Sequence, residues 1–246
     1  MEYKIIHIDE TDSTNGWLWR SMASDMPGYQ SDSNVVVVTD YQTAGRDCGT
    51  NTWESERGRN LTFSVLIHPV EIPAVCQFRI SEIVSLALCE TLDSYLPDQR
   101  VTIKWPNDIY VGDRKICGML IENRLKGRLI TDSVIGIGLN VNQLAFVSDA
   151  PNPVSMAQLL DHEVALEPLL QAILQRLSAV MGMDVETLDT AYRSRLYRQD
   201  GFYEYEDSGG RFFAKVQNVL DDGRLVLLDS EGVVRMYAFK EVGFVV

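Results

Sequence analysis

The sequence predicts an α+β fold, in which a mixed sheet with helices packed on it precedes a small β-barrel. One observation is that strand-like and helix-like patterns alternate through the first two thirds of the 246 residues. A second is that after Tyr197 the chain changes to aromatic residues, glycines and short alternating strands, separated by the turn sequences SGG, DDG and SEG. We therefore expect one domain at residues 1–195 and another at residues 196–246.

Composition narrows the class of protein. Hydrophobic residues make up 46% of the chain and charged residues 23%, which is ordinary for a globular protein. Apolar runs such as VVVV at 35–38 are too short to span a bilayer, and the N-terminus lacks the pattern of a signal peptide. The four cysteines lack the spacing of a zinc site or a disulfide scaffold. These features predict a cytoplasmic protein without a membrane span, and the net charge of −13 disfavours general nucleic-acid binding.

The N-terminal elements surround a long polar segment. An apolar run at 5–8 predicts a strand, and Asp12, Ser13 and Thr14 are typical of a helix start. VVVVT and NLTFSVLIHP predict two more strands. The polar segment between them, residues 42–59, is long for a loop, which favours a functional role in covering a substrate.

The middle of the chain predicts a helix and three neighbouring strands. Apolar residues recur at three- and four-residue steps from 78 to 96, and Pro97 ends this helix. VTIKW, KICGMLIE and SVIGIGLNV predict consecutive antiparallel strands, joined by the turn-like segments NDIYVGDRK and NRLKGRL. Further helices are expected near 154–160 and 166–181.

The segment KWPND, residues 104–108, lies where a strand gives way to a turn. Pro106 restricts Trp105 to extended geometry, so the neighbouring polar groups are held in place. Lys115 follows between apolar neighbours and needs an anion, such as a phosphate or carboxylate, unless it reaches solvent at a strand edge. Gly118 allows a ligand to approach the strand closely.

The polar loop YQTAGRDCGTNTWES also carries candidate ligand-binding groups. Arg46 and backbone donors near Gly45 and Gly49 can bind a carboxylate or phosphate, and Trp53 offers a face for a purine. A flexible turn is the alternative for a glycine-rich loop. The chain contains no P-loop pattern.

Two further segments carry short polar side chains. Ser13, Thr14 and Asn15 can hydrogen-bond a polar ring such as a ureido group, although helix capping is at least as probable from chemistry alone. Asn140 and Asn142 in GIGLNVN can meet a phosphate or a metal-bound water, or form a turn.

In this order, DSTN, QTAGR with its later tryptophan, KWPND, KICGMLIE and GIGLNVN resemble the catalytic domain of biotin protein ligases over residues 5–145. The C-terminal segment resembles the small SH3-like domain of that family. The resemblance implies a catalytic domain at 1–195 with a fold like that of class II aminoacyl-tRNA synthetases. It also implies a two-step reaction, in which biotin and MgATP give biotinyl-5′-adenylate and a lysine of a biotin carboxyl carrier domain then takes the biotinyl group.

The resemblance also implies roles for individual residues. Lys115, Asp108 and Arg46 would be catalytic, with Lys115 at the biotin carboxylate and α-phosphate and Asp108 orienting or deprotonating the acceptor lysine. ATP would contact Trp53, Asn107, Lys115 and Asn140, with magnesium nearby and no protein residue assigned as its ligand. Biotin would contact Ser13, Thr14, Asn15, Gln42, Gly45, Arg46, Lys115 and Gly118.

The chain departs from the family pattern at GRDC, where the family usually has GRG followed by a basic or polar residue. Asp47 places a carboxylate near an anionic intermediate, so we expect faster loss of the adenylate than from an Asp47→Gly variant. The chain begins at the catalytic domain, so we expect an enzyme without the helix-turn-helix of some relatives and without operator binding. Both monomer and homodimer are compatible with the sequence.

Two alternatives remain at this stage. A lipoate protein ligase has a similar fold and also acylates lysines, but it needs a long apolar slot, and DSTN with KWPND favours biotin. A non-catalytic biotin-binding module would keep the pocket and lose turnover. The presence of Lys115, Asp108 and Asn107 argues against that loss, and Asp47 is its only support.

Overall fold

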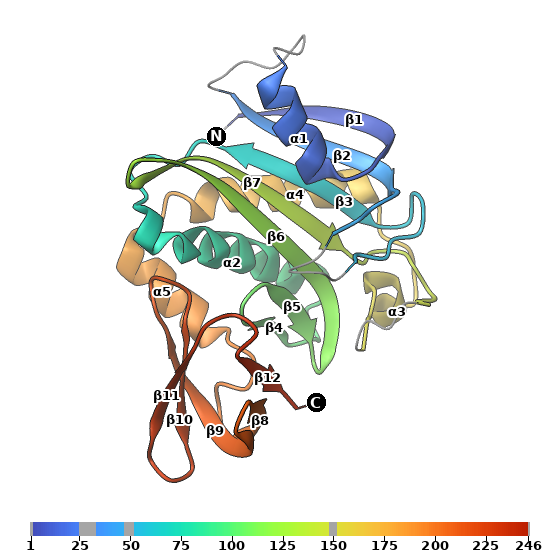
Figure 1. Ribbon diagram of the computed structural model, residues 1–246. Helices are drawn as coiled ribbons and strands as arrows, with labels where there is room; N and C mark the ends of the chain where they lie inside the picture. The colour runs from blue at the N-terminus through green and yellow to red at the C-terminus, as the bar shows by residue number, and fades with distance from the viewer. Residues whose placement is uncertain (1, 25–32, 47–51, 148–151, 246) are drawn as a thin grey trace.

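The computed structural model describes residues 2–24, 33–46, 52–147 and 152–245. Most of these residues build a seven-stranded mixed sheet with helices, and a five-stranded antiparallel sheet follows (Figure 1). Asp47, Cys48 and Gly49 lie outside the described residues, so the expectation for Asp47 stays a prediction. Within these ranges, no helix combines the length and the apolar character needed to cross a bilayer.

The large sheet has the strand order β1-β2-β3-β7-β6-β5-β4. β1 and β2 are parallel, and every other neighbouring pair is antiparallel. The strands are β1 (Tyr3–Thr11), β2 (Asn34–Gln42), β3 (Leu61–Ile67), β4 (Val101–Lys104), β5 (Asp108–Val111), β6 (Arg114–Lys126) and β7 (Leu129–Leu139). The predicted antiparallel pairing is confirmed for KICGMLIE (β6) with SVIGIGLNV (β7), whereas VTIKW (β4) pairs with β5 and not with β6 as expected. The segment NDIYVGDRK was wrongly expected to be only a turn, because four-residue β5 within it is too short to show a period of two.

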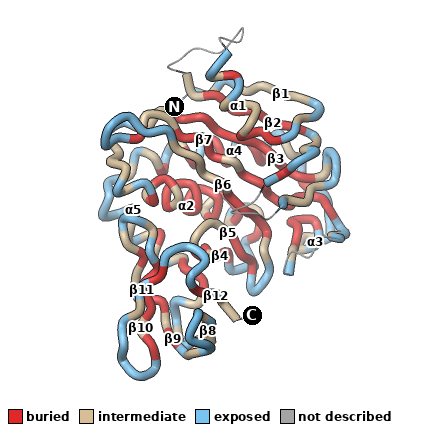
Figure 2. Tube along the Cα trace, in the orientation of Figure 1, coloured by how far each residue is buried: buried red, intermediate tan, exposed pale blue. Residues whose placement is uncertain are grey.

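Helices cover both faces of this sheet. Alternate residues of a strand point to opposite faces, so Val36 packs in the core beneath α2 (Phe78–Tyr95) and α4 (Leu166–Val180). Its neighbours Val35 and Val37 pack with Leu18 of α1 (Thr14–Ala23) on the other face. Figure 2 shows the resulting buried band along the central strands and α2. The helices predicted near 14, at 78–96 and at 166–181 are confirmed.

Three short elements complete the large unit: η1 (Ala74–Cys76), α3 (Met156–Leu160) and α5 (Val185–Ser194). The sequence predicts α3 but not α5. In α5 only Leu188 and Tyr192 are buried, so few apolar residues mark this ten-residue helix in the sequence.

The C-terminal sheet has the order β11-β10-β9-β8-β12. Its strands are β8 (Tyr203–Asp207), β9 (Gly210–Val219), β10 (Leu225–Asp229), β11 (Val234–Tyr237) and β12 (Val242–Phe244). In the part of the chain that is described, this pairing leaves β11 and β12 as edges, so the sheet is open rather than a closed barrel. Because β8–β12 pair among themselves, the topology supports the proposed division near residue 195.

The C-terminal sheet packs against the end of β4. Trp105, which follows β4, donates its indole N–H to the carbonyl oxygen of Gly223 at 2.8 Å. Gly223 has φ +88°, and a Cβ there would lie 2.7 Å from Cδ2 of Phe78 on α2. A glycine is therefore required at this contact both for its backbone angle and for space.

Candidate functional site

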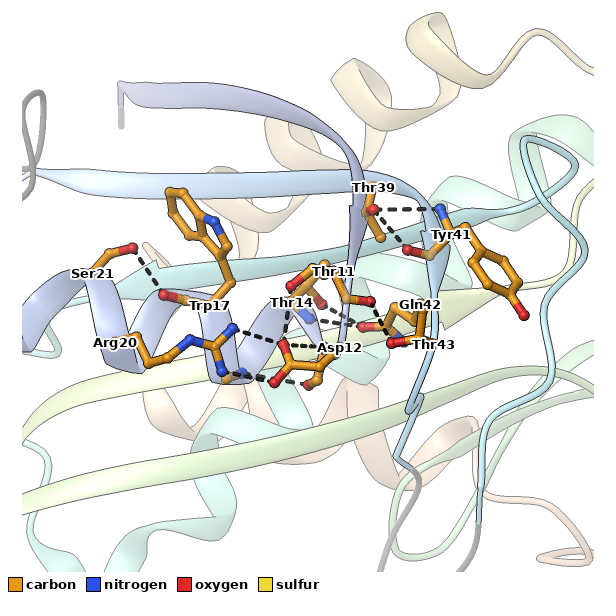
Figure 3. Close-up of polar contacts among 12 residues, drawn as sticks. Thr11, Asp12, Thr14, Trp17, Arg20, Ser21, Thr39, Tyr41, Gln42 and Thr43 are labelled. Atoms are coloured by element: carbon orange, nitrogen blue, oxygen red, sulfur yellow. Dashed lines mark hydrogen bonds and ion pairs between the residues drawn. The ribbon is translucent and has the colours of Figure 1, made fainter.

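The ends of β1 and β2 and the start of α1 form a polar corner of the site (Figure 3). Thr14 donates its backbone N–H to Oε1 of Gln42 at 2.8 Å. Ser13 caps α1, because its side chain accepts from the backbone N–H of Gly16 at 3.4 Å. The capping alternative for Ser13 is thus confirmed.

An ion pair fixes the loop that carries this corner. Arg20 on α1 donates to both carboxylate oxygens of Asp12, at 2.8 and 2.7 Å. This guanidinium holds the pKa of Asp12 well below its usual range. The Asp12 carboxylate also accepts the backbone N–H of Ser13 at 2.7 Å. The β1–α1 loop is therefore anchored at Asp12, immediately before Ser13 and Thr14.

The Asn15 carboxamide is buried and oriented by three partners. Its Nδ2 donates to the Leu120 carbonyl at 3.2 Å and to Oε2 of Glu122 at 2.9 Å, while its Oδ1 accepts from Ser64 at 2.6 Å. Both Nδ2 hydrogens are thereby used, and Oδ1 keeps one lone pair for a ligand N–H. A Cβ at Gly136 would lie 2.5 Å from this Oδ1, so only glycine leaves room for it.

Two glycines on neighbouring strands form the floor of the site. Gly118 of β6 and Gly138 of β7 are register partners. The Trp53 indole lies on them, because a Cβ at Gly138 would be 2.3 Å from its Cε2 and a Cβ at Gly118 would be 3.0 Å from its Cζ3. Trp53 is itself held by its backbone N–H, which donates to the Gly45 carbonyl at 3.0 Å. We call Gly118 and Gly138 the glycine floor.

The Trp53 indole partly fills the cavity above this floor. Seven of the residues that the resemblance implies line it. The lining consists of Ser13, Thr14, Asn15, Gln42, Arg46, Trp53, Thr62, Gly118, Met119, Leu120, Gly136, Ile137 and Gly138. Because the indole covers the glycine floor, a ligand that lies on the floor requires Trp53 to move.

Lys115 and Asp108 form an ion pair beside the floor. Nζ of Lys115 lies 2.7 Å from Oδ1 of Asp108, and their side chains are 11% and 19% exposed. Nζ would also lie 3.1 Å from a Cβ at Gly118. The anion that the buried lysine needs is thus a carboxylate of KWPND. Truncating either partner would leave a largely buried charge without its counter-ion, which is costly.

Lys104, the first residue of KWPND, lies in the same group of strands. Its Nζ donates to the Tyr110 hydroxyl at 2.9 Å. Burial lowers the pKa of Lys104 and raises the pKa of Tyr110 well above its usual range.

Three asparagines that the sequence analysis named, Asn107, Asn140 and Asn142, lie outside the polar corner and hydrogen-bond to the backbone. Asn107 donates to the Met119 carbonyl at 2.8 Å, and Asn140 donates to the Val154 carbonyl at 3.2 Å. Neither lines the cavity. Oδ1 of Asn140 has no hydrogen-bond partner within the described ranges. Asn142 both accepts from the Val164 N–H and donates to its carbonyl, each at 2.9 Å, so it holds the chain and does not face a ligand.

Among the residues that the sequence analysis missed, Ser64, Glu122, Gly136 and Gly138 shape the site most directly. A period of two from Gly118 leads to Leu120 and Glu122 on the same face of β6, so the strand pattern contained a signal for Glu122. Gly136 and Gly138 similarly alternate in GIG of β7. Ser64 lies in a fully buried apolar strand, where no local pattern distinguishes it.

Comparison with known proteins places the chain among ligases. The Bacillus subtilis bifunctional ligase/repressor BirA is 25% identical over 247 residues, covering 97% of this chain and 73% of that protein. The biotin–[acetyl-CoA-carboxylase] ligase of Mycobacterium tuberculosis is 27% identical over 233 residues, covering 92% of this chain and 83% of that protein.

Solved structures share the fold. The biotin protein ligase from Aquifex aeolicus in complex with biotin and ATP superposes with a TM-score of 0.76 and 22% identity, covering 98% of this chain and 97% of that one. A sequence model described as the biotin/lipoate A/B protein ligase family matches residues 8–140, more than half of the chain. The chain therefore belongs to the biotin/lipoate A/B protein ligase family.

Proposed function

We propose that this protein activates biotin with ATP and transfers the biotinyl group to a lysine of a biotin carboxyl carrier domain. The family supports a ligase, and the Mycobacterium tuberculosis and Aquifex aeolicus proteins described above are biotin ligases by name. The observation that carries the choice of biotin is the polar corner beside the glycine floor. There the buried Asn15 Oδ1 keeps a lone pair for a ring N–H, as a ureido group requires.

Biotin would lie with its ring at the polar corner and its carboxylate towards Lys115. Thr14, Gln42 and Ser13 would complete the contacts to the ring. Gly45 and Arg46 would follow the valerate chain, and Gly118 would lie near the ring. In this placement the ligand crosses the glycine floor, which supports the proposal because a side chain there would block it.

In the first step a biotin carboxylate oxygen would attack the α-phosphorus of ATP, and the bond to the β-phosphate oxygen would break to release pyrophosphate. Lys115 and Arg46 would stabilise the negative charge that develops on the phosphate. In the second step a neutral lysine amine would attack the acyl carbon, and AMP would leave with the bonding electrons. Asp108 would orient that amine or accept its proton.

Magnesium would enter with ATP as part of the substrate. Mg²⁺ sites of nucleotide enzymes commonly use few protein oxygens together with phosphate oxygens. The unpartnered Oδ1 of Asn140 fits such a role, and Asn107, on the turn between β4 and β5, is the second candidate. A magnesium titration of pyrophosphate release tests this part, since activity that persists in excess chelator would contradict it.

Trp53 would change place during binding. Its indole covers the glycine floor, which is where a ligand that runs from the polar corner to Lys115 would lie. We propose that biotin displaces the indole, which then stacks on adenine. The tryptophan emission spectrum should therefore shift when biotin binds, and a Trp53→Phe variant should lose that shift.

The test of the proposal is the first half-reaction. Purified protein is mixed with MgATP and either biotin or lipoate, and pyrophosphate and acyl-adenylate are measured. We expect both products with biotin and neither with lipoate. Products with lipoate alone would assign a lipoate ligase, and biotin binding without either product would assign a non-catalytic binding module.

We further propose that the protein acts in the cytoplasm, on a carboxyl carrier domain, as a monomer or a homodimer. A carboxyl carrier domain is the proposed acceptor because it presents the lysine that a biotin ligase modifies.

A further inference from the structure

Glu122 lies directly behind the polar corner and contacts two parts of the site at once. Its Oε2 accepts from Asn15 Nδ2 at 2.9 Å and from the Trp19 indole N–H at 3.2 Å. The same carboxylate pairs with Arg46, with Nη2 3.3 Å from Oε2 and Nη1 3.3 Å from Oε1. Glu122 does not line the cavity, so it acts on a ligand only through these neighbours.

Two donors from the interior of the protein hold the Glu122 carboxylate in place. Trp19 belongs to α1 and donates from a rigid ring, and Asn15 is 2% exposed and anchored by Ser64. Because these two donors converge on Oε2, Oε1 is directed towards the Arg46 guanidinium. An arginine has five N–H donors, so a pair of contacts to Glu122 leaves three for a ligand.

A charged acceptor also changes the Asn15 carboxamide. A carboxylate on Nδ2 polarises the amide group, which strengthens Oδ1 as an acceptor for a ring N–H. A neutral acceptor would do this less. The same carboxylate balances the charge of Arg46, as Asp108 balances the charge of Lys115.

We infer that Glu122 is a positioning residue that ties the ring-binding Asn15 to the adenylate-binding Arg46. The inference rests on the proposed biotin ligase function. It assigns coupled effects to one carboxylate: ring recognition through Asn15 and adenylate retention through Arg46.

Two variants separate these effects. Glu122→Gln keeps one oxygen for Asn15 and Trp19 but turns an amide NH₂ towards Arg46, so biotin affinity should stay within about threefold while adenylate dissociates about 10- to 100-fold faster. Glu122→Ala removes both contacts, so biotin affinity should also fall, by about 10-fold or more. Biotin affinity is measured by calorimetry, and adenylate loss by chasing bound radiolabelled adenylate.

Asp132→Asn is the matched control. Asp132 is a partly buried carboxylate on β7, paired with His68 at 3.0 Å and Arg124 at 3.7 Å, and it does not line the cavity. Its loss should lower the melting temperature by an amount similar to that of Glu122→Gln but leave biotin affinity and adenylate dissociation unchanged.

The outcomes are distinguishable. Wild-type protein that neither binds nor adenylates biotin would overturn the proposed function and this inference with it. Wild-type activity combined with unchanged constants in both Glu122 variants would overturn the inference alone. So would equal losses in Asp132→Asn and Glu122→Gln, because the effect would then be general destabilisation.

Discussion

At the scale of single residues, the site depends on small side chains that leave space for large or polar ones. Gly136 makes room for Asn15, and Gly138 makes room for Trp53. The sequence analysis named Asn15 and Trp53 but not the glycines, because the need for a glycine arises from a neighbour that is distant in the sequence. The sequence left open whether Lys115 meets an anion or reaches solvent, because its pairing with Asp108 depends on the register of β5 and β6.

Replacing Gly138 by alanine should disturb the site directly. The new methyl group would clash with the indole, at 2.3 Å from Cε2 of Trp53, and would stand where the ligand crosses. Overpacking of this kind costs about 1–3 kcal/mol, so kcat/KM for biotin should fall about 10- to 100-fold. Steady-state pyrophosphate release measures this. Gly182→Ala, where the nearest atom is 3.4 Å away, is the control and should keep wild-type values.

Asp108→Asn should separate the two chemical steps. Asparagine is nearly the same size but cannot accept a proton, so transfer to the carrier should slow about 100-fold or more. Adenylate formation should slow less, because Lys115 keeps its charge. Single-turnover measurements of each step test the assignment, which would be contradicted by equal losses in both.

At the scale of elements, hydrogen bonds from amide side chains hold the loops that border the site. Asn60 donates to Gln143 at 2.6 Å and accepts the Val141 N–H at 2.9 Å. Gln143 in turn contacts Glu54, in the segment just after Trp53. The sequence predicted the polar segment and its strands, but such braces join residues more than eighty positions apart and leave no local pattern.

Asn142 forms a brace of shorter sequence separation. It exchanges two hydrogen bonds of 2.9 Å with the backbone of Val164, just before α4. Asn142→Ala should therefore lower the free energy of unfolding by about 2–4 kcal/mol, since two buried backbone groups lose their partners. Urea denaturation measures this. A loss below about 0.5 kcal/mol would mean that water replaces the amide and that the brace is unimportant.

At the scale of the whole molecule, the two sheets meet at α2 and α5, beside Trp105 of KWPND. The sequence predicted both units from the change in composition after Tyr197, but it could not predict their contact. That contact depends on Gly223 fitting against Phe78, and it brings Glu82 of α2 near Asp189 of α5 and Asp221 of the β9–β10 turn.

Glu82 should make stability depend on pH. Burial, aided by Asp189 and Asp221 and opposed by Arg79 and Arg193, raises its pKa from 4.5 to about 7. The folded state then holds this proton more tightly than the unfolded state, so stability should fall as pH rises from about 4.5 through 7. Glu82→Gln should thus raise the melting temperature at pH 8 and change it little at pH 5, whereas exposed Glu2→Gln should change neither. Equal effects of Glu82→Gln at both pH values would contradict the raised pKa.

The most direct test of the central claim is the mass of a purified carboxyl carrier domain after incubation with this protein, biotin and MgATP. The proposed function predicts that the carrier gains one biotinyl group, that the gain requires ATP, and that lipoate gives no gain. The Lys115→Ala variant should give no gain either, although its secondary structure should match that of the wild-type protein. A carrier whose mass stays unchanged with wild-type protein, ATP and biotin would contradict the claim.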